Sequence, residues 1–249
     1  ESIAYNRNRQ NGDIMFYEFG NSYYFDADKK VEGETLKEYS EEFHLGLWLS
    51  GNSISNSWVA ADTKTSVYEL KAYVENILTR LGIDKNKYEY VQLSNDIYSS
   101  VLTIQSRNRV LGTIGIVNKK LLKAQDINSE VYFAELNWNA LMKEIKKHTV
   151  TFGEISRYPA VKRDLALLVD KNVLFDQIEK TAYKVERKLL KDITLFDVYE
   201  GKNLPDGKKS YAVNFVLQDY EKTLNDKQIE TIMKKILSAL ENELGAQLR

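Results

Sequence analysis

Apolar and polar positions alternate along the chain with two different periods, and these periods predict the secondary structure. Residues 67–81 carry apolar side chains at helical spacing, and Gly82 follows as a stop signal. Ser66 and Glu69 give the pattern of a capping box in front of this helix. Four further segments are short and apolar and predict strands, at residues 88–93, 99–104, 109–117 and 131–136. We therefore expect a largely antiparallel sheet with few helices in this part of the chain.

The flanking segments of this first part are less regular. Residues 3–9 have the pattern of the end of a helix. Residues 14–25 are rich in Phe and Tyr and predict two paired strands, broken at Gly20-Asn21-Ser22. The other segments are expected to form a loop, a strand, a loop and two short helices, at residues 26–42, 44–49, 51–57, 119–124 and 138–147.

The pattern changes in the second part of the chain. Apolar residues recur from Phe175 to Leu189 at spacings of 3, 4, 3 and 4, which predicts an amphipathic helix. A second helix begins at Asn225, and Gly245 lies where a left-handed cap ends it. Strands are expected at residues 164–170, 194–200, 210–218 and 246–248. The order βαββαβ indicates a ferredoxin-like unit, with both helices on one face of the sheet and the other face open.

Alternation along these strands assigns side chains to the two faces. The apolar set is expected to face the helices: Leu165, Leu167, Val169, Phe196, Val198, Tyr211, Val213, Phe215 and Leu217. The opposite set is expected on the open face: Asp164, Ala166, Leu168, Leu195, Asp197, Tyr199, Ser210, Ala212, Asn214, Val216 and Gln218.

Small residues beside a tyrosine and a carboxylate form a surface on which a flat ring can bind. Tyr199 offers a stacking surface, which is worth about 1–3 kcal/mol per nucleic-acid base. Asp197 can accept hydrogen bonds from the adjacent donors on the Watson–Crick edge of guanine. Basic residues at strand ends could contact a phosphate backbone: Lys162, Arg163, Lys202, Lys208 and Lys209. The alternative interpretation is an ordinary amphipathic sheet surface with solvated lysines.

Composition limits the possible functions. The chain has 249 residues, 43% of them apolar and 29% charged, and a formal net charge of −1, which is typical of a globular protein without a global field toward nucleic acid or membrane. The absence of cysteine excludes disulfides, thiol catalysis and zinc–thiolate sites. No run is apolar enough to span a bilayer. Because the sequence opens at Glu1 without Met, within a helical pattern, we interpret it as a fragment of a longer protein.

Catalytic and metal-binding patterns are scarce. His44 and His148 are the two histidines, and neither has a neighbouring cysteine or histidine as a co-ligand. The sequence contains no phosphate-binding loop and no nucleophile elbow. Glu41-Glu42 is better interpreted as a solvated pair than as an acid–base dyad. We therefore expect no catalytic residue and no metal site in this chain.

Three motifs in the second part resemble, in order, the ferredoxin-fold anticodon-binding domain. They are Arg157-Tyr158-Pro159-Ala160-Val161-Lys162-Arg163-Asp164-Leu165-Ala166, Leu195-Phe196-Asp197-Val198-Tyr199-x-Gly201-Lys202, and Lys209-Ser210 with Leu217-Gln218-Asp219 and Thr223-Leu224. This domain closes the β subunit of bacterial phenylalanyl-tRNA synthetases.

The first part resembles the region just upstream in the same family. The similar stretches are Tyr5-Asn6-x-Asn8-Arg9, Tyr17-Glu18-x-Gly20, Tyr68-Glu69-Leu70-Lys71 and Gly112-x-x-Gly115. In the family, that region is similar to a class II synthetase catalytic fold that has lost its catalysis. The chain departs from the family where histidine–proline pairs are frequent, since Tyr98-Ser99 and Asn118-Lys119 stand in those places.

The resemblance implies an α+β chain of two domains. Residues 1–152 would be an inactive class II synthetase-like domain and residues 153–249 a ferredoxin-fold anticodon-binding domain. The implied tRNA-binding residues are Tyr158, Lys162, Arg163, Ala166, Asp197, Tyr199, Lys202, Ser210 and Ala212.

The same resemblance implies the partners and the place of the chemistry. The partners would be phenylalanine tRNA and a synthetase α subunit in a cytoplasmic α2β2 enzyme, with no DNA and no membrane involved. ATP and Mg would act in the parent enzyme, and this fragment would hold no cofactor and no catalytic centre. Because βαββαβ units also serve as metabolite-sensing or protein-interaction modules, such a module is the alternative hypothesis. An autonomous enzyme has the least support.

Overall fold

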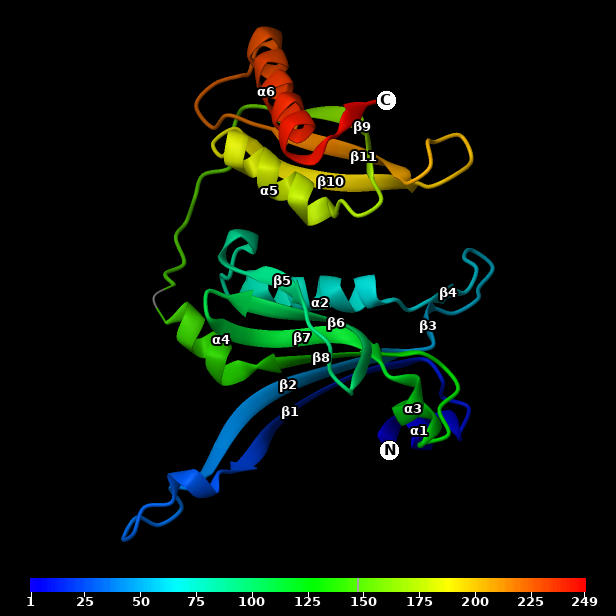
Figure 1. Cartoon of the computed structure of the whole chain (residues 1–249), viewed down its shortest axis with the longest axis vertical. Helices are drawn as coiled ribbons and strands as arrows, with labels where there is room; N and C mark the ends of the chain where they lie inside the picture. The colour runs from blue at the N-terminus through cyan, green and yellow to red at the C-terminus, as the bar shows by residue number, and fades with distance from the viewer. Residues whose placement is uncertain (147) are drawn as a thin grey trace. The chain divides into compact units, whose positions relative to one another are not determined.

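Two antiparallel sheets organise the chain, and each belongs to a separate compact unit (Figure 1). The structure is a computed structural model that describes residues 1–146 and 148–249. Unit 1 comprises Glu1–Thr151 and unit 2 comprises Phe152–Arg249. The predicted α+β class with largely antiparallel strands is confirmed.

Unit 1 is built on a six-stranded sheet with the order β1-β2-β8-β7-β6-β5. Its strands are β1 Ile14–Phe25, β2 Tyr39–Ser50, β5 Glu89–Gln92, β6 Tyr98–Ser106, β7 Arg109–Val117 and β8 Val131–Asn137, with β3 Asn52–Ile54 and β4 Thr63–Lys64 forming a separate small pair. Its helices are α1 Ser2–Arg7, α2 Val67–Arg80, α3 Lys119–Lys123 and α4 Trp138–Ile145, with 3₁₀ turns at Ala27–Lys29 and Lys85–Lys87.

Helix α2 packs on this sheet through the apolar stripe that the sequence predicts. Leu70, Val74 and Leu78 are fully buried and join the core formed by β2, β6, β7, β8 and α4. The Ser66 hydroxyl accepts a hydrogen bond from the Glu69 backbone N–H at 3.3 Å and so caps the first turn. The predicted helix at residues 138–147 is observed as α4, although its last predicted residue lies outside the described residues.

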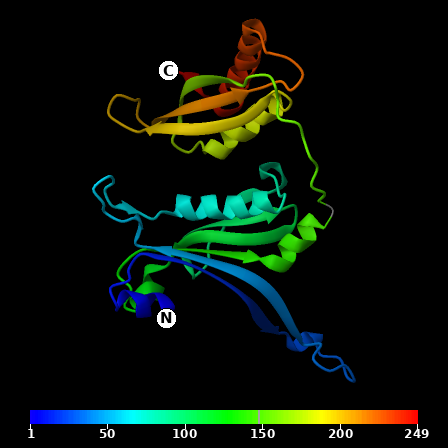
Figure 2. The ribbon, with the colours of Figure 1, turned by 180° about the vertical axis from the view of Figure 1, so that it is seen from behind.

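The predicted strand pair at residues 14–25 is wrong, because these residues form the single strand β1. Gly20 pairs with His44 of β2 in regular register, and it does not have the positive φ of a turn glycine. Tyr39 and Phe25 are also paired, so β2 begins inside the predicted loop at residues 26–42. Figures 1 and 2 show β1 and β2 as one long ribbon with the 3₁₀ turn near its far end.

Unit 2 has the predicted ferredoxin-like order of elements. Its strands and helices are β9 Val161–Asp170, α5 Phe175–Val185, β10 Leu190–Tyr199, β11 Lys208–Leu217, α6 Asp226–Leu244 and β12 Gln247–Leu248. The sheet order β10-β11-β9-β12 places the first and third strands of the unit at the centre. Gly245 has a φ of 62°, so the left-handed cap predicted at the end of α6 is confirmed.

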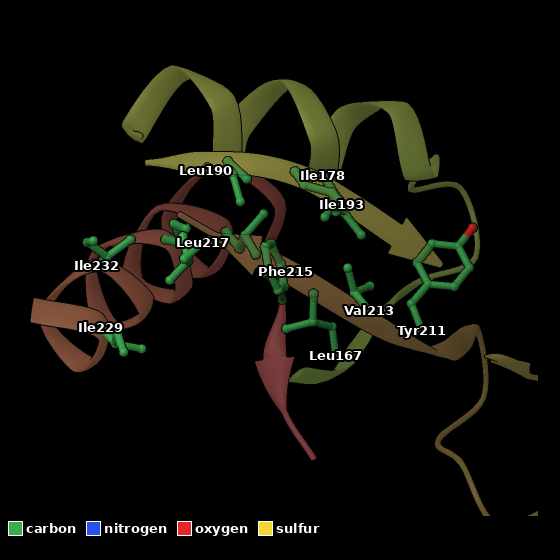
Figure 3. Packing of buried hydrophobic residues seen from close by; sticks show 14 of the residues in the cluster. Leu167, Ile178, Leu190, Ile193, Tyr211, Val213, Phe215, Leu217, Ile229 and Ile232 are labelled. Atoms are coloured by element: carbon green, nitrogen blue, oxygen red, sulfur yellow. The ribbon is translucent and has the colours of Figure 1, made fainter. Parts of the chain in front are cut away.

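The core of unit 2 lies between this sheet and its two helices. Figure 3 shows Phe215, Leu217 and Leu190 pointing from the strands toward Ile178 of α5 and Ile232 of α6. Phe215 and Ile178 are fully buried. Because both helices cover this one face, the other face of the sheet carries no helix of unit 2.

Candidate nucleic-acid interface

The register of the central strands determines which side chains share the open face of unit 2. Residues directly paired in an antiparallel sheet point to the same side. Tyr199 pairs with Ser210, which pairs with Leu168, and the next row on this face joins Asp197, Ala212 and Ala166. We call these two sets of three residues the central rows. The structure thus brings together five predicted site residues: Ala166, Asp197, Tyr199, Ser210 and Ala212.

A β-bulge in β10 turns the acid and the tyrosine toward this face. Leu195 pairs with Val213 and Asp197 pairs with Ala212, so Phe196 is the extra residue. Leu195 packs against the core with Val213. With regular alternation Asp197 would point the same way as Leu195, into the core. The extra residue reverses the phase, and Asp197 lies on the open face.

The face assignment of two residues in the sequence analysis is therefore wrong. Phe196 was expected against the helices but is 58% exposed, whereas Leu195 was expected on the open face and packs on the core. Val198 pairs with Tyr211 on the helix side, as expected, but lies half exposed near the end of the sheet. The bulge leaves a signal in the sequence. Apolar residues occupy odd-numbered positions before it, at Ile193 and Leu195, and even-numbered positions after it, at Phe196 and Val198.

The tyrosine ring is held from two directions. A Cβ added to Gly201 would overlap the hydroxyl of Tyr199 and its ring carbon, so the ring lies directly against this glycine. The guanidinium carbon of Arg249 lies 5.5 Å from the ring centroid, within the range of a cation–π contact. Tyr199 is nevertheless 37% exposed. The ring is therefore fixed in place and still accessible from solvent.

The carboxylate of Asp197 is available to a ligand. Asp164, in the row beyond the central rows, accepts a hydrogen bond from the side-chain amide of Asn214. In the part of the chain that the structure describes, no side chain donates to the exposed carboxylate of Asp197. Asp197 therefore retains its full capacity to accept hydrogen bonds.

The predicted basic residues are spread over the unit. Lys162 pairs with Val216 on the open face, toward the end of the sheet away from Tyr199. Arg163 pairs with Phe215 and so lies on the helix side, where its guanidinium is 3.7 Å from the Asp226 carboxylate. Lys202 is exposed in the loop between β10 and β11.

Lys208, Lys209 and Tyr158 each contact another residue of unit 2. Lys208 forms an ion pair of 2.9 Å with Asp170. Lys209 is only 7% exposed, and its ammonium lies 4.6 Å from the Tyr211 ring centroid on the core side, so it is not placed to contact a phosphate backbone. The backbone carbonyl of Tyr158 accepts a hydrogen bond of 2.8 Å from Gln218. Tyr158 thus lies at the end of the sheet away from the central rows.

In unit 1, three stacked aromatic side chains lie on the sheet face opposite α2. Trp48 stacks on Phe133 at 4.9 Å between centroids, and Tyr98 stacks on Phe133 at 5.9 Å. Gly46 lies under Trp48 and Gly115 under Tyr98, with no room for a Cβ at either position. Burial raises the pKa of Tyr98 to about 12, while its hydrogen bond with the Thr113 hydroxyl opposes this shift. We call Trp48, Phe133 and Tyr98 the aromatic stack.

The two histidines lie in different surroundings within unit 1. His44 lies within β2, with its ring nitrogens 3.4 Å from Glu42 and 3.3 Å from Glu135. His148 packs its ring on Gly82. Among residues 1–146 and 148–249, no group of three or more His, Cys, Asp or Glu side chains is arranged to hold a metal ion. No helix in the same residues is long and apolar enough to cross a membrane.

Two protein-family models match the chain, one in each part. Residues 1–138 match the family model described as phenylalanyl tRNA synthetase beta chain CLM domain. Residues 156–249 match the model described as ferredoxin-fold anticodon binding domain.

Comparison over the whole chain finds phenylalanine–tRNA ligase beta subunits as relatives. The chain is 59% identical over 250 residues to the phenylalanine–tRNA ligase beta subunit of Bacteroides fragilis and 48% identical to that of Porphyromonas gingivalis. Each alignment covers all of this chain but only 30% of the relative. Among solved structures, a pyrrolysyl-tRNA synthetase from Desulfitobacterium hafniense matches 61% of this chain and 52% of its own, with a TM-score of 0.38 and 14% identity.

The contact between Gly201 and Tyr199 generates a prediction. Gly201→Ala should displace the tyrosine ring, because the new methyl group would occupy the space of its hydroxyl end. The aromatic NMR signals of Tyr199 should therefore shift. Gly153→Ala is the matched control, since a Cβ there meets no atom within 4 Å and should leave these signals in place. Unchanged Tyr199 signals in Gly201→Ala would contradict the observed packing.

Proposed function

Because the chain belongs to the phenylalanyl-tRNA synthetase β-chain family, we propose that it serves an enzyme that attaches phenylalanine to its tRNA. In this proposal residues 153–249 bind the anticodon, and residues 1–152 are a scaffold for the partner subunit. The observation that supports the anticodon role most directly is the pair of central rows, with a free carboxylate and an accessible tyrosine around small residues. The metabolite-sensing alternative is not favoured, because both parts of the chain match synthetase families.

The central rows suit a single flat base. The ring of Tyr199 provides the stacking surface, worth about 1–3 kcal/mol. Ala166 and Ala212 leave space above the sheet beside it, because their side chains end at Cβ. Asp197 accepts hydrogen bonds from the ring N–H and the amino group of guanine, which no other standard base presents together. Ser210, which pairs with Tyr199, is only 5% exposed, so we propose that it forms part of the floor on which the base lies.

The remaining predicted residues would contact the RNA outside the base pocket. Lys162 and Lys202 are exposed near opposite ends of the open face, where they can contact phosphates. Tyr158 lies near the Lys162 end. Arg163 lies on the helix side, so we assign it a role only where the RNA extends past the edge of the sheet. Such contacts add affinity without base specificity.

We further propose that this chain carries no part of the aminoacylation chemistry. The aromatic stack occupies part of the unit 1 sheet face opposite α2, where Trp48 and Tyr98 lie over Gly46 and Gly115. The described residues also lack a cluster suited to Mg²⁺. ATP and Mg would therefore act on a synthetase α subunit, in a cytoplasmic α2β2 assembly.

The surface proposed to meet that subunit is the ribbon of β1 and β2. Among the described residues, β8 pairs with β2 only from His44 onward, so residues 39–43 of β2 pair with β1 alone. Strand β1 is the edge strand of the sheet over its whole length. Aromatic side chains follow its surface: Tyr17 and Tyr23 are 73% and 74% exposed, and Phe25 and Tyr39 contact each other near its end. A long edge strand with exposed aromatics is typical of a protein–protein interface.

The first test concerns the carboxylate. Asp197→Ala should weaken binding of the phenylalanine anticodon stem-loop by roughly 10- to 100-fold, because hydrogen bonds to a charged group contribute about 1.5–3 kcal/mol. Binding is measured by fluorescence anisotropy at fixed salt. Asp192→Ala is the matched control, since Asp192 is an exposed acid near the other end of β10. Equal affinities of the two variants would exclude Asp197 as the base reader.

The second test concerns the ribbon. Tyr17→Asp combined with Tyr23→Asp should abolish most co-purification with the synthetase α subunit, because charges would enter a surface that is buried in the complex. Tyr68→Asp is the control, as Tyr68 is 79% exposed on α2 and lies outside the ribbon. Undiminished co-purification of the ribbon variant would place the interface elsewhere.

The third test concerns the chemistry. The chain alone should show no phenylalanine-dependent exchange of pyrophosphate into ATP, and addition of the α subunit should restore exchange. The proposed physical reason is the aromatic stack, which occupies part of the unit 1 sheet face opposite α2. Exchange by the chain alone would show that it contains a catalytic centre.

A further inference from the structure

Arg249 extends the last strand of unit 2 onto the open face. Its backbone N–H donates a hydrogen bond of 2.9 Å to the carbonyl oxygen of Ala166. Gln247 and Leu248 pair with Leu168 and Leu167, so the ladder continues by one residue. Since Gln247 shares the face of Leu168, alternation puts Arg249 on the face of Ala166. The backbone of Arg249 is thus fixed beside the central rows.

The side chain of Arg249 reaches across the sheet. Two strands, β9 and β11, lie between β12 and β10 in the sheet order. The guanidinium nevertheless lies 5.5 Å from the ring centroid of Tyr199 on β10. The small side chains of Ala166 and Ala212 along this path allow such a crossing. A larger residue in either place would stand in its way.

The charge of this guanidinium has no counterion among the residues that the structure describes. Asp197 lies in the row that Arg249 joins, yet in the described part of the chain no carboxylate comes within ion-pair distance of Arg249. Its contact to the Tyr199 ring is an exposed cation–π contact, which leaves the planar fork of N–H donors accessible. A cation held in this way attracts an anion beside the position where the proposed base stacks.

We propose that Arg249 binds a phosphate of the nucleotide whose base stacks on Tyr199. This inference rests on the proposed anticodon role of unit 2. A stacked nucleotide carries its own phosphate within a few ångströms of the ring, and a guanidinium binds phosphate oxygens in a bidentate manner. Asp197 reads the base and Arg249 neutralises the backbone, so the two opposite charges of one row act on different parts of one nucleotide.

The experiment compares four proteins with the phenylalanine anticodon stem-loop across a range of salt concentrations: the unaltered chain, Arg249→Ala, Arg249→Lys and Arg187→Ala. Arg187 is an exposed arginine before β10 and serves as the control for the loss of one positive charge. Arg249→Ala should weaken binding about fivefold and reduce the slope of log affinity against log salt by about 0.7, because one phosphate contact is lost. Arg249→Lys should restore most of the slope, and Arg187→Ala should change the affinity by less than about twofold.

A second RNA separates the backbone contact from base reading. In a stem-loop with adenine in place of the anticodon guanine, Arg249→Ala should cause the same fold loss, since a phosphate contact carries no sequence information. Equal affinities and slopes for Arg249→Ala and Arg187→Ala would overturn the role of Arg249. If that result occurs while Tyr199→Ala still weakens binding, the anticodon proposal stands without Arg249. If the unaltered chain binds neither RNA, both proposals fail together.

Discussion

The β-bulge at Phe196 is the constraint on which the open face of unit 2 depends. A strand offers only two directions for its side chains, and Leu195 has to point into the core. One inserted residue separates this packing requirement from the direction of Asp197 and Tyr199. The acid and the ring therefore lie opposite the small residues of β11, while the apolar residues on the other side of the bulge still close the core. The core and the candidate interface are built from one strand without competing for its residues.

In unit 2 the sequence was sufficient for the order of elements but not for this local detail. The helical stripes of α2, α5 and α6 are recognisable from their period, and Gly82 and Gly245 end two of these helices as expected. Helix α5 ends at Val185, so Leu189, which the spacing assigned to its stripe, lies outside the helix. Alternation over a strand of ten residues is a weaker signal, because a single extra residue inverts every position after it. The faces of Leu165, Val213 and Phe215 were predictable because β9 and β11 pair without a register shift, whereas Leu195 and Phe196 lie at the bulge of β10.

Long-range pairing accounts for the other differences. Gly20-Asn21-Ser22 has the composition of a turn, but pairing with residues 42–44 holds it in an extended strand. Lys209 has the sequence context of a solvated turn, yet the Tyr211 ring draws its side chain to the core side. The position of Arg249 beside Tyr199 depends on three separate strand pairings, and no local pattern contains that information.

At Ala166 and Ala212, in the two central strands of unit 2, the stability of the sheet conflicts with the space needed by the proposed base. Alanine is a poor strand former, and β-branched residues such as valine or threonine favour this environment by up to about 1 kcal/mol. Filling the two positions would give a more stable sheet but would close the space in front of Asp197. Under the proposed anticodon role, selection for stability and selection for base binding act in opposite directions at these two residues, and a screen for thermostable variants would tend to select against base binding.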